Sequence, residues 1–357
     1  MKKLLLFLFS IVAFCLQVEA SLERAKEIAQ KSIDDGHIAG IAVICGTSTS
    51  IEKSFYLGNS SKNGQIPFDT NSIIDMASVT KAVAISTALA ICNDRKLIDL
   101  DAPFTKYLPQ YKCNLKDTPT VRDLAMHVSG FVGKPYGKAK NGKDMLEQSL
   151  KFKPKRKTGL KYEYACWNFI LLGQILENIT KQPLSEFCKK EIFQPLNMSS
   201  TSLGLPINTE KTRLSKTMNS PDFGTISDPH ANIIFRDGLC AGNAGMFSTA
   251  IDLSKYCQMM LNSGKLNDKQ ILGKSFAELT TNKCQAPNAK RSFGWDMTKT
   301  SLPKNFSELS ITHSGWSGQS VFIDIKNNKF VVVLTVRCGN YKKAKQERID
   351  IAEEISK

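Results

Sequence analysis

The distribution of apolar residues changes along the chain and predicts different elements in different segments. Apolar residues recur at helical spacing over Leu22–Ile33, and an Asp-Asp-Gly sequence typical of a helix end follows. The runs Ile38–Cys45 and Ser54–Leu57 are rich in β-branched and aromatic residues and flank a Ser/Thr-rich turn, which predicts two strands. The segment Val79–Asn93 is rich in Ala, Ile, Val and Leu and free of Gly and Pro, which predicts a mostly buried helix.

The middle of the chain has a helical pattern, and the C-terminal part returns to strands. Between Leu97 and about Phe235, helical segments such as Trp167–Ile179 are separated by Pro and Gly. Two apolar runs at 321–325 and 330–336 flank an Asn-Asn turn and predict a hairpin, and a charged amphipathic helix follows at 343–355.

Strands and flanking helices therefore come from both ends of the sequence, with helices inserted between them. This order predicts an α/β fold, with an antiparallel sheet flanked by helices and an inserted all-helical lobe. We expect one large domain over 21–357, with a sheet lobe from about 21–77 and 236–357 and a helical lobe from about 78–235.

The N-terminus has the pattern of a secretory signal peptide over residues 1–20. Lys2 and Lys3 precede an apolar run from Leu4 to Leu16, and a Val-Glu-Ala sequence predicts cleavage after Ala20. A retained anchor is the alternative, although the apolar run is short for a membrane span. We expect a secreted or periplasmic protein without stable membrane insertion after cleavage.

Composition narrows the classes of partner. The net charge of +15 favours anionic surroundings or substrates, but a Lys-rich proteome would give the same balance. Basic residues are scattered along the chain, so a nucleic-acid partner is not indicated. One dense run, Lys151–Lys157, could line the mouth of a substrate pocket and favour a carboxylate, or it could be a solvated loop. The ten Cys and four His residues lack CxxC, HxH and HExxH spacing, so we expect no metal or cofactor.

Ser78 and Lys81 have the Ser-x-x-Lys spacing, which places a hydroxyl and an amine on one face of a helix. A neutral amine could accept the serine proton, and burial at a helix N-terminus would favour the neutral form by lowering the lysine pKa. The same spacing begins at Ser50 and Ser301, but only Ser78 precedes a long apolar helix. An ordinary helix N-cap is the alternative role for Ser78.

Five segments together resemble the serine β-lactamase and penicillin-binding-protein superfamily, and most closely its class C β-lactamases, D-amino-acid peptidases and related esterases. They occur in the family's order, and the resemblance extends over most of the chain. The segments are IDMASVTK at 74–81 with KLIDLD at 96–101, TVRDL with HVSG at 120–130, YEYAC at 162–166, GNAGMFSTAID at 242–252, and HSG at 313–315.

This resemblance implies a β-lactamase/transpeptidase-like fold and a role for each matched residue. Ser78 would form the acyl-enzyme, Lys81 would accept its proton, and Tyr164 would carry a proton to the leaving group and act as the base for deacylation. The backbone amides of Ser78 and Trp316 would form the oxyanion hole.

The resemblance also implies a substrate-binding set. His313, with Ser314 and Gly315, would lie on the edge strand, where His313 could bind Tyr164 or a substrate carboxylate and Gly315 would let the substrate approach closely. Cys166 departs from the family, because Asn, Ser or Asp usually stands there, and a thiol is a weak hydrogen-bond partner. This departure favours ester or peptide hydrolysis over β-lactam hydrolysis.

The sequence therefore predicts a serine hydrolase that acts through an acyl-enzyme on an ester, peptide or β-lactam carbonyl of a small-molecule or peptide substrate. Two alternatives remain open at this point. One is a penicillin-binding D,D-peptidase that deacylates slowly, and the other is a non-catalytic binding protein with the same fold.

Overall fold

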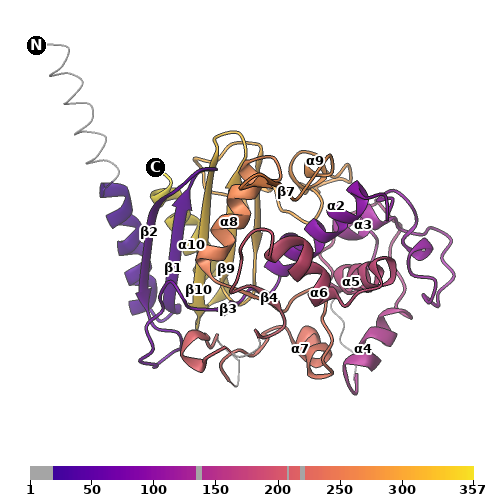
Figure 1. Ribbon diagram of the computed structural model, residues 1–357, viewed down its shortest axis with the longest axis horizontal. Helices are drawn as coiled ribbons and strands as arrows, with labels where there is room; N and C mark the ends of the chain where they lie inside the picture. Colours follow the sequence, from indigo (N-terminus) through magenta and orange to yellow (C-terminus); the bar gives the residue numbers. More distant parts are fainter. Residues whose placement is uncertain (1–18, 134–138, 207–208, 218–221) are drawn as a thin grey trace, which may run out of the picture.

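The computed structural model describes residues 19–133, 139–206, 209–217 and 222–357 (Figure 1). The predicted signal peptide therefore lies almost entirely outside the described residues. Residues 19–34 are helical and include the helix predicted over Leu22–Ile33. Within the described ranges, no helix combines the length and apolarity that a membrane crossing requires.

A five-stranded antiparallel sheet joins the two ends of the chain. Its strand order is β2-β1-β10-β9-β8, and pairing of β1 with β10 brings the N-terminal and C-terminal strands together. The predicted strands and hairpin are confirmed. The strands are β1 (Ile38–Gly46), β2 (Ile51–Gly58), β8 (Ser310–Ser314), β9 (Gln319–Asp324) and β10 (Lys329–Arg337).

Helices cover both faces of this sheet (Figure 1). Successive side chains of a strand point to opposite faces, so Val331 and Val333 of β10 pack with helix 19–34 and α10 (Tyr341–Ile355). Val332 and Leu334 face the other way, into a core shared with α8 (Ala250–Leu261) and the helical lobe. The buried runs in the sequence are thus explained by a sheet covered on both faces.

The helical lobe lies beyond α8 (Figure 1). The predicted buried helix after Ser78 is confirmed, and its first part, Lys81–Ser86, has π-helical hydrogen bonding. The inserted region is not entirely helical, because it contributes β4 to a small sheet with β3 and β5. The remaining elements are β3 (Ile74–Asp75), α2 (Thr87–Asp94), η2 (Phe104–Lys106), α3 (Val121–Ala125), α4 (Gly142–Ser149), α5 (Cys166–Thr180), α6 (Leu184–Cys188), η3 (Lys189–Phe193), β4 (Ser202–Leu203), η4 (Lys211–Arg213), α7 (Pro229–Arg236), β5 (Met246–Ser248), β6 (Lys265–Leu266), β7 (Lys269–Gln270), α9 (Phe276–Thr280) and η5 (Lys299–Ser301).

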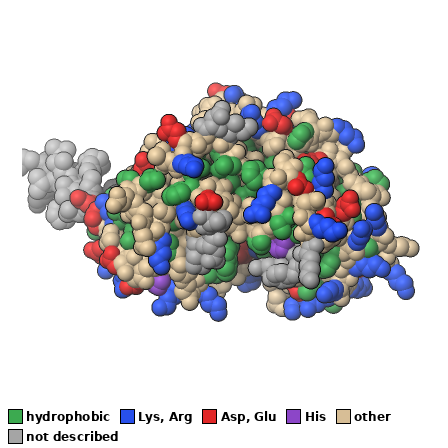
Figure 2. Space-filling model, turned by 90° about the horizontal axis from the view of Figure 1, so that it is seen from below, with side chains coloured by type: hydrophobic (Ala, Val, Ile, Leu, Met, Phe, Trp, Pro, Cys, Tyr) green, Lys and Arg blue, Asp and Glu red, His purple; other side chains and the backbone are tan. Residues whose placement is uncertain are grey.

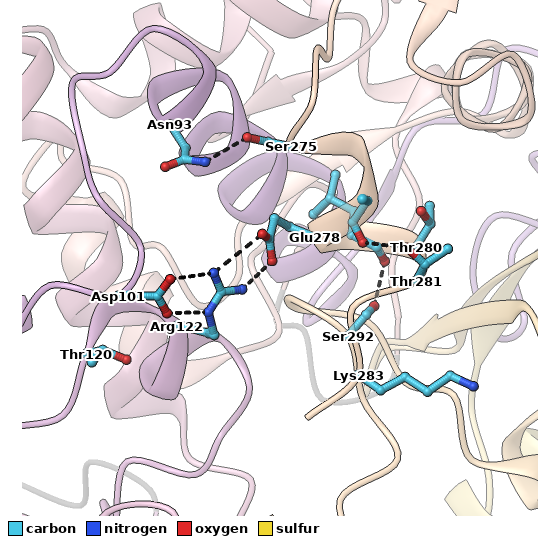
Figure 3. Close-up of polar contacts among 12 residues, drawn as sticks. Asn93, Asp101, Thr120, Arg122, Ser275, Glu278, Thr280, Thr281, Lys283 and Ser292 are labelled. Carbon is cyan, nitrogen blue, oxygen red and sulfur yellow. Dashed lines mark hydrogen bonds and ion pairs between the residues drawn. The ribbon is translucent and has the colours of Figure 1, made fainter. Parts of the chain in front are cut away.

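A polar network ties α9 to the helical lobe (Figure 3). Arg122 of α3 donates through Nε to Asp101 Oδ1 at 2.6 Å and also pairs with Glu278 of α9. Asn93 Nδ2 donates to Ser275 Oγ at 2.8 Å. Two carboxylates share the Arg122 guanidinium, and such charged hydrogen bonds restrict the relative positions of their groups. The network therefore holds α9, and with it the start of the segment that leads to β8, against the helical lobe.

Candidate active site

Ser78 lies in a tight turn between β3 and the long helix. Ala77, directly before it, has a φ of 43°, in a left-handed region that L-residues rarely adopt. Asp75 stabilises the turn, since its Oδ1 accepts the Ala77 amide at 3.0 Å. Its Oδ2 accepts the Ser227 amide at 3.0 Å and the Ser227 hydroxyl at 2.5 Å. Burial raises the pKa of Asp75 to about 6, although the hydrogen bonds from Ser227 and Ala77 oppose the rise.

Lys81 lies one helical turn after Ser78 and is fully buried. Its Nζ is 3.0 Å from Ser78 Oγ, 2.6 Å from the carbonyl oxygen of Asn243, and 5.1 Å from the centre of the Tyr164 ring. The amine therefore donates to two oxygens and lies against the ring.

The expectation of a lowered Lys81 pKa is wrong. Burial acts to lower this pKa, but the neighbouring side chains of Cys166 and Tyr164 outweigh it, so the Lys81 pKa lies above its ordinary value. The physical reason is that groups able to carry negative charge surround the amine, which the apolar helix pattern did not reveal.

Tyr164 precedes α5 and packs against a buried imidazole. The ring centres of Tyr164 and His127 are 4.5 Å apart. Nδ1 of His127 accepts the Ala165 amide at 3.2 Å and faces Asn168 Nδ2 at 3.1 Å. Burial, and then the positive charges of Arg291 and Lys81, hold the pKa of His127 well below its ordinary value. His127 is thus a neutral support for Tyr164.

His313 lies on β8, the edge strand, with its ring buried. Nδ1 is 3.1 Å from the carbonyl oxygen of Ser314, which can only accept, so Nδ1 carries the hydrogen and Nε2 has a free lone pair. Burial, Arg291 and Lys81 hold the pKa of His313 well below its ordinary value. A neutral ring with an acceptor at Nε2 suits a hydroxyl or amide donor, whereas the expected role of binding a carboxylate is not supported.

Gly315 has a packing role. A Cβ atom at this position would lie 2.6 Å from the carbonyl oxygen of Met76, in the turn that presents Ser78. Glycine is therefore required because the end of β8 approaches the nucleophile turn closely. The expectation that Gly315 also lets the substrate approach closely stays a prediction.

Trp316 lies at the rim of the site and is 48% exposed. Its ring stacks on Tyr341 with ring centres 4.9 Å apart, and the guanidinium carbon of Arg337 is 4.4 Å from the indole centre. Arg337 Nε donates to the Trp316 carbonyl at 2.6 Å, which fixes this backbone beside Ser78. The Ser78 amide donates to no other residue in the described part of the chain.

One cavity of about 370 Å³ gathers these residues, a volume suited to a small ligand. Lys81, which donates to Ser78 Oγ, and Gly315 do not line it. The predicted site residues that line the cavity are Ser78, Tyr164, Cys166, His313, Ser314 and Trp316.

The basic run Lys151–Lys157 does not line this cavity, although its Arg156 pairs with Glu163, between the cavity-lining Tyr162 and Tyr164. Each of its basic side chains is exposed, and none lines the cavity. The amides of Lys155 and Arg156 instead donate to the carbonyl of Gly130, at 2.9 and 3.2 Å. Lys and Arg side chains are spread over the face in Figure 2, with acidic and apolar side chains between them. The run is a solvated loop, the second of the two interpretations.

Asn243 and Arg291 belong to the site although they are not among the predicted site residues. Asn243 supplies the carbonyl that binds Lys81, and it lies in the Gly-rich segment at 242–252, which was noted without a role. Arg291 lines the cavity from the segment between α9 and β8, where no motif marks it. Among the described residues, no group of three or more His, Cys, Asp or Glu side chains is arranged as metal ligands would be.

Comparison with known proteins agrees with this geometry. The family model described as Beta-lactamase matches residues 25–354. The N-acetylmuramyl-L-alanine amidase of Bacillus subtilis (strain 168) is 25% identical over 88% of this chain and 80% of its own length. The solved structure of EstCE1, a hydrolase with promiscuous acyltransferase activity, covers 96% of this chain and 100% of its own with a TM-score of 0.80 at 17% identity. A class C β-lactamase structure covers 94% and 95% of the two chains with a TM-score of 0.78 at 16% identity.

The predicted family and fold are therefore confirmed, and the expectation of a hydrolase is confirmed with them. The family match extends over both the sheet and the helical lobe, including every segment that reaches the cavity. This chain belongs to the β-lactamase family of serine hydrolases.

Proposed function

We propose that this protein hydrolyses ester or peptide carbonyls through an acyl-enzyme on Ser78. The observation that carries the proposal is the 3.0 Å contact between Lys81 Nζ and Ser78 Oγ, on a cavity that Tyr164 also lines. A nucleophile, a buried cation and a phenol at one accessible site match the needs of acyl transfer. A binding protein would have no evident use for all three groups.

Tyr164 takes the Ser78 proton in this mechanism, and Lys81 supplies positive charge. Lys81 is protonated at rest because its pKa is raised, so it donates to Ser78 Oγ and cannot accept from it in that state. The Tyr164 hydroxyl, beside this ammonium ion, would accept the Ser78 proton as it passes its own proton to the leaving group. In deacylation the same oxygen would activate water.

Backbone amides would stabilise the oxyanion that develops in both steps. The Ser78 amide is available, and Trp316 lines the cavity on backbone that Arg337 holds in place. Loss of one such donor typically lowers the rate by a factor of about 100 or more. Rigid support of both amides therefore favours catalysis.

Cys166 favours esters and peptides over β-lactams as substrates. Its side chain lines the cavity and is 4% exposed, close to Lys81. A thiol binds a substrate amide weakly, so a rigid bicyclic substrate would be poorly oriented, whereas a flexible acyl group depends less on this contact. The names of the compared amidase and of EstCE1 describe amide and acyl-group chemistry.

We also propose that the protein acts outside the cytoplasm, in the periplasm or the surrounding medium. The basic and apolar pattern of residues 1–20 supports export. Mass spectrometry of protein from the native host tests this proposal, because cleavage would give a chain that begins at Ser21. A chain that keeps the first twenty residues and stays in the cytoplasm would contradict it.

Hydrolysis of a nitrophenyl ester and labelling by a fluorescent penicillin test the catalytic proposal. We expect ester turnover, and both Ser78→Ala and Tyr164→Phe should lower kcat by at least about a thousandfold, as for members of one catalytic unit. Ser50→Ala is the matched control, because the exposed Ser50 begins another Ser-x-x-Lys sequence.

Mass spectrometry of the quenched reaction should locate the acyl group on Ser78. Equal turnover by the wild type and Ser78→Ala would refute the proposal. A stoichiometric burst with penicillin and no further turnover would instead identify a slow-deacylating D,D-peptidase.

A further inference from the structure

Trp316 is a large apolar residue that stays exposed at the rim of the cavity. It lines the cavity and is 48% exposed. Within the described residues, the other exposed large apolar side chains are Ile51, Leu97 and Leu160, and none of these three lines the cavity. An exposed indole at the edge of a binding site offers a broad apolar surface to a ligand.

Arg337 and Tyr341 support the indole without covering both of its faces. From the indole centre, the Tyr341 ring centre is 4.9 Å away and the Arg337 guanidinium carbon is 4.4 Å away. The guanidinium carbon is 5.6 Å from the Tyr341 ring centre. Two groups on opposite faces of the indole would be separated by nearly the sum of the two shorter distances. Arg337 and Tyr341 therefore do not sandwich the indole, which agrees with its exposure.

The backbone of Trp316 is fixed relative to the nucleophile. The buried Arg337 donates from Nε to the Trp316 carbonyl at 2.6 Å. The neighbouring Ser317 donates from Oγ to the carbonyl of Asp75 at 2.9 Å, in the turn that presents Ser78. Because the ring and its backbone are already held in place, a ligand that stacks on the indole orders little additional protein.

Two walls of the cavity come from different parts of the fold. Tyr162 and Tyr164 precede α5 in the helical lobe, whereas Trp316 follows β8 and Tyr341 begins α10. In the proposed function the leaving group receives a proton from Tyr164, so it would lie against the first wall. The carbonyl oxygen would lie between the amides of Ser78 and Trp316. The substituent on the acyl side of the carbonyl is then directed to the second wall.

We propose that Trp316, supported by Tyr341, binds an aromatic ring on the acyl group of the substrate. The inference rests on the proposed function, which supplies the positions of the leaving group and of the carbonyl oxygen. The substrate class is an ester or amide whose acyl group carries an aromatic ring close to the carbonyl. Aromatic rings favour offset or edge-to-face contacts, and a partly exposed indole at a cavity rim allows both.

Two nitrophenyl esters with the same leaving group test the proposal, one of phenylacetic acid and one of acetic acid. The measured quantity is the ratio of kcat/KM for the phenylacetate ester to kcat/KM for the acetate ester. Trp316→Ala should lower this ratio by about 10-fold to 30-fold, the range expected when a ring loses much of its apolar contact. Trp316→Phe should retain part of the preference. Leu160→Ala, at an exposed apolar residue outside the cavity, should leave the ratio unchanged.

An unchanged ratio in Trp316→Ala would overturn the proposal. An equal fall for both esters would also overturn it, since it would mean that the substitution disturbs the oxyanion amide and not a contact with the ring. If Ser78→Ala still hydrolysed both esters, the proposed function would fail instead.

Tryptophan fluorescence of the wild type tests the ring contact even if the variants fail to fold. The other two tryptophans, Trp167 and Trp295, are buried, so acrylamide in solution should quench mainly Trp316. Phenylacetamide should protect Trp316 from acrylamide, whereas acetamide at the same concentration should not. Equal quenching in the presence of the two amides would contradict the inference.

Discussion

Replacing Asp75 with Asn should lower kcat while leaving the free energy of unfolding at pH 7 close to that of the wild type. The carboxylate accepts three hydrogen bonds, one from Ala77 and two from Ser227. The amide of Asn keeps one accepting oxygen. If that oxygen still accepts the Ala77 amide, the new NH₂ group faces the Ser227 amide. Both of these groups are donors, so the Ser227 amide loses its hydrogen-bond acceptor. A buried backbone amide that loses its partner costs about 1–3 kcal/mol.

The same substitution removes a buried charge, which offsets this cost above pH 6. The pKa of Asp75 is raised to about 6 from an ordinary value of 3.8, so ionisation in the folded state costs about 3 kcal/mol more than in the unfolded chain. The folded protein holds this proton more tightly, so wild-type stability falls as the pH rises from about 4 to about 6. Asp75→Asn lacks this fall, and its stability at pH 7 should be within about 2 kcal/mol of the wild type.

Catalysis should suffer regardless of this balance. The left-handed Ala77 and the Ser227 loop at the cavity wall are both fixed by Asp75, and a misplacement of about 1 Å at a reacting group costs about 100-fold in rate. We expect kcat for the ester to fall by about 10-fold to 100-fold with a smaller change in KM.

Urea unfolding at pH 4, 5, 6 and 7, with kcat measured at pH 7, tests these expectations. The free energy of unfolding of Asp75→Asn should rise relative to the wild type by up to about 3 kcal/mol between pH 4 and pH 7. A difference that stays constant across this range would refute the buried-charge reasoning. An unchanged kcat would refute the positioning role of Asp75.

Two further substitutions test the site. Cys166→Asn should raise kcat/KM for a chromogenic cephalosporin relative to a nitrophenyl ester by at least about tenfold, because an amide side chain replaces a weak hydrogen-bond partner; a constant ratio would show that Cys166 does not limit β-lactam hydrolysis. Gly315→Ala should lower the free energy of unfolding by about 1–3 kcal/mol and also lower kcat, since the added Cβ would lie 2.6 Å from the Met76 carbonyl. Denaturant titration and ester assays measure both effects, and wild-type values would mean that β8 can move away without cost.

Sequence patterns determined the elements whose geometry is local. The two apolar runs at 321–325 and 330–336, on either side of an Asn-Asn turn, predicted the hairpin, because strand and turn preferences act locally. The contact between Ser78 and Lys81 was also predictable, because residues three apart on a helix share a face whatever surrounds them. The proximity of Tyr164 to Ser78 and Lys81 was predicted only from the resemblance to a family, because no local rule links residues so far apart in the chain.

The tertiary structure alone decided the electrostatics and close packing of the site. The raised pKa of Lys81 depends on Cys166 and Tyr164, and the neutral state of His313 depends on burial and on cations from other segments. Arg291 reaches the cavity without any sequence motif. These properties depend on distances between segments that are remote in the sequence. Because Coulomb and desolvation energies change steeply with such distances, the sequence pattern does not predict them.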